Sequence, residues 1–390
     1  MRNIILLGLV SFFADISSEM VYPIIPLYLT SAFGATPVLI GVIEGIAESL
    51  ASLLKVFSGY FTDRYKNKKV IAFMGCSTGL IYKVALICAG SWLGILGARM
   101  IDRIGKGIRT TPRDVMVSES ANNDNMGKAF GVHKALDMAG SAIGILLAFI
   151  LVSGISGDFE YKNLFLISMI PMVLGLVMFT FIREKKDGHV LENRESFWQN
   201  IKQLDSQLKL YLVVVFVFTL GNSSNAFLLL RAKSIGFNDT TVILLYFIYN
   251  ITASILAMPC GKLSDKIGRK ALLVSGYIVF ALVYLGMAFA FNKVFMISIF
   301  ILYGAYTAMI TGVERAFIAE ISPKELKGTM LGLQSTIVGV ALLPASMIAG
   351  VLWNSLGARV PFIFGAIMSL GAAGVLLFLM KGINYERIEK

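Results

Sequence analysis

The chain has 390 residues, of which 56% are hydrophobic and only 15% are charged, whereas soluble domains usually carry about 25% charged residues. A water-soluble protein of this length could not cover so much apolar surface, so the composition excludes an ordinary soluble enzyme and predicts an all-α membrane protein. The formal net charge of +11 would suit a nucleic-acid partner. Its Lys and Arg residues gather in the short segments between apolar blocks, however, which indicates membrane topology and no nucleic-acid binding.

Apolar blocks of about 20 residues, the length of a helix that crosses a bilayer, follow one another along the chain. The spans predicted for the first half are 4–30, 38–58, 70–90, 93–118, 128–151 and 163–182. Those predicted for the second half are 209–230, 240–260, 271–291, 294–319, 329–351 and 359–380. The pattern therefore predicts twelve transmembrane helices in two six-helix bundles, residues 1–182 and residues 209–390.

A polar, charged connector, residues 183–208, separates the predicted bundles. Its residues Phe197, Ile201, Leu204 and Leu208 recur at helical spacing, so an amphipathic helix on the membrane surface and a plain tether both fit. Lys and Arg are concentrated in this connector and in the loops that follow the second and eighth predicted spans. The positive-inside rule then predicts a multi-pass protein of the cell inner membrane with both termini in the cytoplasm.

Those two loops carry related sequences. Gly59, Asp63 and Arg64 follow the second span, and Gly261, Asp265 and Lys266 follow the eighth span 202 positions later. A second set of residues repeats at a shift of 201: Glu119, Gly127 and Gly131 against Glu320, Gly328 and Gly332. A nearly constant offset across several motifs indicates that the chain arose by duplication of a six-helix unit.

The loop residues resemble the signature G-x-x-x-D-[RK]-x-G-[RK]-[RK] of the major facilitator superfamily, which is complete from Gly261 to Lys270 and degraded in the first loop. The resemblance implies two bundles that rock about a central cavity, lined by spans 1, 4, 7 and 10. It also implies a cytoplasmic gate, made of Gly59, Asp63, Arg64, Gly261, Asp265, Lys266 and Arg269. Each gate carboxylate is expected at the N-terminal end of a helix in the other bundle, near Gly328 or Gly127. The alternative is that these loops only reverse the chain and set its topology.

The fourth predicted span carries charges at helical spacing. Arg99, Arg103, Lys106, Arg109 and Arg113 share one helix face that is about 21 Å long. Each would cost about 3 kcal/mol or more facing lipid, so this face must look into protein or a wet cavity. Acids occur in neighbouring spans of the same half: Asp15, Glu19, Glu44, Glu48 and Asp137. By chain direction, Glu44 and Arg99 belong in the outer half of the membrane, and Glu48 and Arg103 nearer the middle.

Two interpretations of these charges remain open. In the first, acids and bases form a static network that stiffens the first bundle, and we expect this of most of them. In the second, some pairs open, so that carboxylates take up protons and cations bind an anionic group. The predicted proton-coupling residues are Asp15, Glu19, Glu48 and Asp137. The predicted substrate-binding residues are Arg99, Arg103, Lys106, Asn222, Asn225, Tyr303 and Tyr306.

The function predicted from these features is secondary active transport. We expect a monomeric, proton-coupled carrier of a small polar solute, anionic or zwitterionic, with export favoured over import by the family resemblance. A multidrug carrier, a carrier of metal chelates or siderophores, and a proton-coupled importer are the alternatives, and a non-transporting membrane sensor fits less well. The sequence contains no G-x-S-x-G, H-E-x-x-H or complete phosphate-loop motif, so no enzyme activity is predicted. With two histidines in all, no metal site and no cofactor are predicted.

Overall fold

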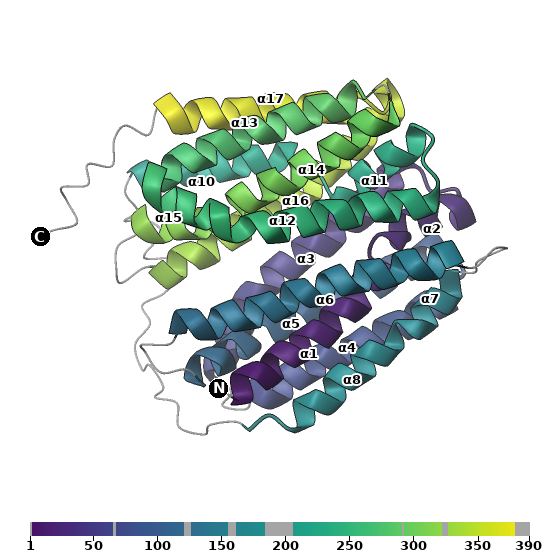
Figure 1. The fold of residues 1–390 in the computed structure, drawn as a ribbon, viewed down its shortest axis with the longest axis vertical. Helices are drawn as coiled ribbons and strands as arrows, with labels where there is room; N and C mark the ends of the chain where they lie inside the picture. Colours follow the sequence, from purple (N-terminus) through teal and green to yellow (C-terminus); the bar gives the residue numbers. More distant parts are fainter. Residues whose placement is uncertain are drawn as a thin grey trace, which may run out of the picture.

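The computed structural model describes residues 2–64, 68–120, 126–154, 161–183, 206–290, 292–321 and 327–378, and the regular elements within these ranges are α-helices (Figure 1). They form two bundles. The first bundle consists of α1 (Arg2–Val21), α2 (Ile24–Phe33), α3 (Pro37–Arg64), α4 (Lys68–Cys88), α5 (Trp92–Glu119), α6 (Met126–Gly154), α7 (Tyr161–Ile167) and α8 (Met169–Thr180). The second consists of α10 (Ser206–Gly221), α11 (Asn225–Ser234), α12 (Asp239–Ile267), α13 (Arg269–Ala288), α14 (Lys293–Ile310), α15 (Val313–Ile321), α16 (Lys327–Leu356) and α17 (Val360–Phe378).

Eleven stretches of the described chain are long and apolar enough to cross a membrane. The helix α5 is not one of them, because its charged residues lower its hydropathy, yet it packs on α3 and α4 inside the first bundle. With α5 as a further span, the predicted fold of twelve transmembrane helices in two bundles is confirmed. The amphipathic helix considered for the connector lies outside the described residues, apart from Arg183 and the beginning of α10.

The first span of each bundle is broken at a corresponding place. The helices α1 and α2 meet at Tyr22 and Pro23, because Pro23 lacks the N–H that a continuous helix would use. The helices α10 and α11 meet before Ser224, whose Oγ accepts a hydrogen bond from the N–H of Ala226 at 3.3 Å and so caps α11. The sequence predicted one continuous helix at each place. Broken helices near the middle of a membrane protein leave backbone groups free to bind a solute or an ion.

The first helix begins and the last described helix ends at the same end of the molecule (Figure 1). We name this the basic end, because the helix termini there carry Lys69, Lys262, Lys266, Arg269 and Lys270. The helices α2 and α11 lie at the opposite end (Figure 1).

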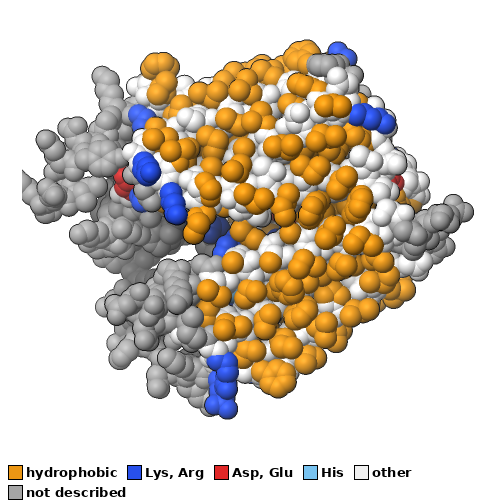
Figure 2. Space-filling model, viewed as in Figure 1, with side chains coloured by type: hydrophobic (Ala, Val, Ile, Leu, Met, Phe, Trp, Pro, Cys, Tyr) orange, Lys and Arg blue, Asp and Glu red, His pale blue; other side chains and the backbone are white. Residues whose placement is uncertain are grey.

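The two bundles meet along α3 and α16, along α6 and α12, and where α2 and α3 reach α11. Glycine permits the close crossing of α3 and α16, since a Cβ atom on Gly41 would lie 2.2 Å from the carbonyl oxygen of Ser346. The Ser49 hydroxyl donates to the carbonyl oxygen of Gly339 at 2.5 Å. Because α3 begins at the opposite end, the crossing at Gly41 holds the bundles together there, and the contact of Ser49 holds them near the middle of α3. Figure 2 shows apolar side chains over both bundles and a furrow between them with Lys and Arg side chains at its basic end.

Candidate functional site

The charged face of α5 looks into the first bundle, towards α1, α3 and α6. The helix α5 also packs closely on its neighbours: a Cβ atom on Gly107 would lie 2.6 Å from the Cβ of Leu54 in α3. On the α4 side, a Cβ atom on Gly75 would lie 2.8 Å from the backbone nitrogen of Arg109. These small residues fix the rotation of α5 about its axis and so turn its arginines away from lipid.

The pair nearest the opposite end is Arg99 with Glu44. Arg99 donates through Nε to Glu44 Oε1 at 3.1 Å and through Nη2 to Oε2 at 2.7 Å, and the two side chains are 2% and 1% exposed. Ser224 of the second bundle also donates to Glu44 Oε2 at 3.4 Å. The Arg99 guanidinium lies 5.3 Å from the ring centre of Tyr22. With both oxygens of its carboxylate occupied, this pair has the geometry of a fixed structural contact.

The next pair, one helical turn on, is Arg103 with Glu48. Arg103 Nη2 lies 2.9 Å from Glu48 Oε1, and the Glu48 side chain is 28% exposed. Asp102 Oδ2 lies between the two arginines, 3.7 Å from Nη1 of Arg99 and 3.6 Å from Nε of Arg103. This pair is therefore more loosely held and wetter than the pair of Arg99 and Glu44.

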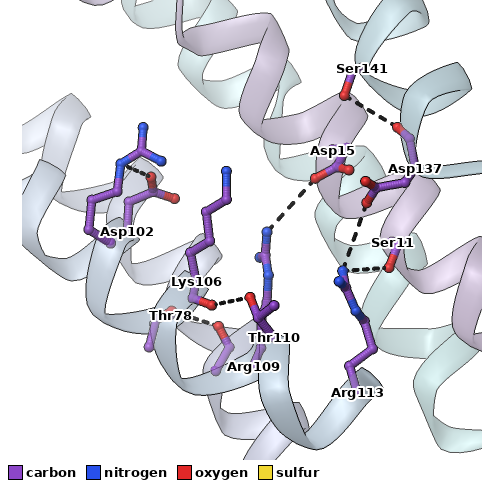
Figure 3. A network of polar contacts seen from close by, with 12 residues as sticks. Ser11, Asp15, Thr78, Asp102, Lys106, Arg109, Thr110, Arg113, Asp137 and Ser141 are labelled. Atoms are coloured by element: carbon purple, nitrogen blue, oxygen red, sulfur yellow. Dashed lines mark hydrogen bonds and ion pairs between the residues drawn. The ribbon is translucent and has the colours of Figure 1, made fainter. Parts of the chain in front are cut away.

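A second cluster of charges joins α1, α5 and α6 nearer the basic end (Figure 3). Arg109 Nη2 lies 3.9 Å from Asp15 Oδ1, and Arg113 Nη1 lies 3.8 Å from Asp137 Oδ1. Figure 3 shows the carboxyl groups of Asp15 and Asp137 beside each other, close enough to interact. Two of the predicted proton-coupling residues, from helices far apart in the sequence, are thus brought together.

Smaller polar groups complete this second cluster. The Ser11 hydroxyl accepts a hydrogen bond from Arg113 Nη1 at 3.0 Å and lies 3.0 Å from Nε2 of His133. Lys134 Nζ donates to Asp137 Oδ2 at 2.5 Å. A void of about 10 Å³, lined in part by Ser11, Arg109 and Arg113, is large enough for one water molecule. The sequence did not identify Ser11 as a site residue, and no pattern around it would have done so.

Glu19 and Lys106 differ from the paired charges of α3, α5 and α6 described above. Within the part of the chain that the structure describes, neither side chain has an ion-pair partner. Glu19 Oε2 accepts a weak hydrogen bond, 3.5 Å long, from the hydroxyl of Tyr246 in the second bundle. Lys106 extends between the side chains of Asp102 and Arg109 (Figure 3). Lys106 is among the cations near Glu19, so one charge of each sign without an ion-pair partner in the described chain lies in the same region.

The second bundle faces these charges with tyrosines and amides. The Tyr303 hydroxyl donates to Asn225 Oδ1 at 2.7 Å, and Asn222 Nδ2 donates to the Tyr306 hydroxyl at 3.3 Å. The four predicted substrate-binding residues of this bundle therefore form two bonded pairs between α14 and the break at α10 and α11. Ring contacts extend the set into a continuous row from α1 to α14, made of Tyr22, Tyr246, Tyr249, Tyr303 and Tyr306. Sequence reasoning did not choose Tyr22, although its position before the helix-breaking Pro23 was a usable signal.

The predicted gate at the basic end remains a prediction. The side chains of Gly59, Asp63, Arg64 and Asp265 fall outside the described residues, as do those near Gly127 and Gly328. Lys266 is exposed, and a Cβ atom on Gly261 would meet no other atom. Arg269 Nη1 donates to Glu320 Oε2 at 2.7 Å, a contact between α13 and α15 inside the second bundle.

A contact between the bundles at the opposite end was not anticipated. The Tyr161 hydroxyl at the start of α7 donates to Asp239 Oδ2 at 2.5 Å, and Lys233 Nζ donates to Asp239 Oδ1 at 2.6 Å. Asp239 begins α12, so this hydrogen bond joins the first bundle to the second. No repeat or motif links residues 161 and 239, which explains why the sequence alone could not pair them.

A broken first span in each bundle, a buried charged helix and a furrow between two bundles define a membrane transporter. The family model of the major facilitator superfamily matches residues 7–229 and again residues 210–387. An uncharacterized MFS-type transporter of Methanocaldococcus jannaschii is 36% identical over 384 residues, which cover 97% of this chain and 95% of that protein. The chain therefore belongs to the major facilitator superfamily.

Two further likenesses are more distant. A homologue of the multi-drug resistance efflux pump PmrA from Lactococcus lactis subsp. lactis is 23% identical over 341 residues, covering 83% of this chain and 81% of that protein. The crystal structure of a D-xylose–proton symporter superposes with a TM-score of 0.77, covering 96% of each chain at 15% identity. That structural likeness concerns the fold alone.

Proposed function

We propose that this transporter carries a small zwitterionic solute across the cell inner membrane by alternating access, coupled to protons. The observation that supports the proposal most is that Glu19 and Lys106, charges of opposite sign, have no ion-pair partner among the described residues. Unpaired charges inside a membrane are costly, and in transporters they mark substrate and ion sites. A ligand that carries one charge of each sign neutralises both and adds no net charge to the interior.

The groups around Glu19 and Lys106 suit a solute that carries one charge of each sign. An ammonium group of the solute would bind the Glu19 carboxylate beside the ring faces of Tyr22 and Tyr246, which attract cations. A carboxylate or phosphate of the solute would bind Lys106. The tyrosine row and the amides Asn222 and Asn225 would hold the rest of the molecule. Arg99, already bound to Glu44 through both oxygens, is a poorer candidate for direct contact with the solute than Lys106.

Proton coupling is assigned to the neighbouring carboxyl groups of Asp15 and Asp137. Two carboxylates side by side repel each other, so one proton held between them is a favourable arrangement. Arg109 and Arg113 lie 3.9 and 3.8 Å from these groups, too far for strong hydrogen bonds, and Arg113 is held instead by Asp114 Oδ1 at 3.0 Å. Movement of α1 against α5 and α6 would change these distances and so take up or release the proton. Glu48, bound to Arg103, is a weaker candidate.

We infer the orientation of the transporter in the membrane and its conformational state from its positive charges and from the contacts between its bundles. We assign the basic end to the cytoplasm, because positively charged loops are retained there. The contacts of Ser224 with Glu44 and of Tyr161 with Asp239 join the bundles at the opposite end, as in an inward-facing carrier. Export is favoured by the likeness to the PmrA homologue, whose name describes an efflux pump.

Counterflow in proteoliposomes tests the proposed transport. Purified protein is first screened by thermal shift against zwitterionic, anionic and cationic metabolites, and the stabilising compounds are tested for exchange of labelled for unlabelled solute. We expect zwitterions to exchange, Glu19→Gln to weaken binding of the ammonium end, and Lys106→Met to weaken binding of the acidic end. Lys293→Met, which removes an exposed amine at the opposite end, is the matched control and should exchange like the wild type. Absence of counterflow for every stabilising compound would exclude a carrier.

Proton coupling is tested separately with the same proteoliposomes. Asp15→Asn should retain counterflow, which needs no proton gradient, and should lose solute movement driven by an imposed pH gradient. Glu314→Gln is the control, because Glu314 is a carboxylate of the second bundle that accepts a hydrogen bond from Tyr277 at 3.1 Å. Full gradient-driven transport by Asp15→Asn would remove Asp15 from the coupling mechanism.

Efflux of organic cations is the second candidate function, since Glu19 and the tyrosine row would also bind an aromatic cation. Such a substrate does not need Lys106. Unchanged transport by Lys106→Met together with loss in Glu19→Gln would favour this candidate over a zwitterion carrier.

A further inference from the structure

A groove of about 310 Å³ lies on α12 near the basic end, away from the interior charges. Its lining residues are Met258, Pro259, Lys262, Leu263 and Lys266, all of them on α12. Their spacing of one, four, five and eight positions from the first places them on one side of the helix. The groove is therefore a feature of the surface of a single helix.

The part of this groove further from the basic end is apolar and is not covered by other side chains. Ile255 is 66% exposed and Met258 is 71% exposed, and Leu263 is 42% exposed beside them. In a protein with twelve spans, exposed apolar side chains along a span face the acyl chains of lipid. Pro259 lacks an N–H group, so the carbonyl of Ile255 loses its helical partner and the helix can open locally at the groove.

The part of the groove nearer the basic end carries two positive charges that have no counter-ion among the described residues. Lys262 and Lys266 are one helical turn apart and both exposed, and among the described residues neither has a hydrogen bond or an ion pair. Neighbouring cations are satisfied, since Arg269 binds Glu320 and Lys270 binds the carbonyl oxygen of Leu377. Two free amines at the boundary between apolar surface and water form a site for an anion.

We propose that this groove binds an anionic phospholipid, with the phosphate of the headgroup between Lys262 and Lys266 and an acyl chain along Ile255 and Met258. A free phosphate would satisfy the amines but leave the apolar half of the groove uncovered, whereas a phospholipid covers both halves at once. The leaflet on the cytoplasmic side carries anionic lipid and attracts basic residues at the ends of spans. The site lies apart from Glu19 and Lys106, so it does not depend on the proposed substrate.

Native mass spectrometry of the purified full-length protein, titrated with phosphatidylglycerol or phosphatidylcholine, tests the site. We expect phosphatidylglycerol to bind and the double variant Lys262→Gln, Lys266→Gln to bind it about 25-fold more weakly, a factor of about five for each lysine. The matched control is the double variant Lys162→Gln, Lys293→Gln, which removes two exposed lysines at the opposite end and should bind like the wild type.

Three results would overturn the proposal. Equal binding of phosphatidylglycerol by the groove variant and the control would show that the lysines are not the site. Equal binding of phosphatidylcholine would show that the charge of the headgroup is not recognised. Displacement of the lipid by inorganic phosphate at the same concentration would show a phosphate site that does not use the apolar half. The size-exclusion profile of each variant reports whether it is folded before the titration.

Discussion

Neutralising Glu44 should destabilise the protein far more than neutralising Glu48. Glu44→Gln leaves the guanidinium of Arg99 buried, with only Asp102 at 3.7 Å to balance it. Removing one partner of a fully buried ion pair costs about 3–5 kcal/mol, and because Asp102 remains, we expect a value near the lower limit, about 3 kcal/mol. Glu48 is 28% exposed and lies 2.9 Å from Arg103 Nη2, so Glu48→Gln should cost about 1 kcal/mol.

The assay is thermal unfolding of the detergent-solubilised protein, followed by the fraction that remains monodisperse after heating. The double variant Glu44→Leu, Arg99→Leu should recover most of the stability lost by Glu44→Gln, because it removes the isolated charge as well as the pair. If Arg99 and Glu44 form a structural contact, this double variant should also retain counterflow. Equal stability of Glu44→Gln and Glu48→Gln, or loss of counterflow in a stable double variant, would refute this reasoning.

Two further predictions concern the closed opposite end. Gly41→Ala should force α3 away from α16, since the new Cβ would lie 2.2 Å from the Ser346 carbonyl oxygen. Distances between spin labels placed across the opposite end should then lengthen. Gly374→Ala, where a Cβ meets no other atom, is the control that should leave these distances unchanged. Tyr161→Phe removes the hydrogen bond to Asp239 and should shift the population of conformations towards a state open at the opposite end. Unchanged spin-label distances in both Gly41→Ala and Tyr161→Phe would show that these contacts do not hold that end closed.

The fold could be predicted from the sequence because a helix that crosses a bilayer must be about 20 residues long and mostly apolar. Each apolar block became a helix or a pair of helices, and α5 was identified as a span in spite of its charges because apolar residues surround them. What the pattern did not contain were the breaks in the helices. A proline at position 23 marks one of them, but the break before Ser224 depends on a capping hydrogen bond that is specific to this fold.

The pairing of charges was predictable only in part. Glu44 and Glu48 have the same spacing as Arg99 and Arg103, so two helices that run in the same direction bring both pairs together. The partner of Asp15 was not predictable, because the rotation of α1 about its axis depends on packing with α6. The sequence could not show either that Lys106 has no ion-pair partner among the described residues, since it lies on the same helix face as four arginines that all have partners. Sequence patterns identify a charged face, but the packing of neighbouring helices decides which charge on it stays unpaired.

The central claim is that Lys106 faces an interior that opens to one side of the membrane at a time. Thiol labelling of Lys106→Cys, in a chain whose native Cys76, Cys88 and Cys260 are replaced by alanine, tests it most directly. A membrane-impermeant reagent should label position 106 from the side of the basic end, and Asp239→Asn should increase labelling from the other side. Labelling from neither side, or only by reagents that dissolve in lipid, would contradict the claim.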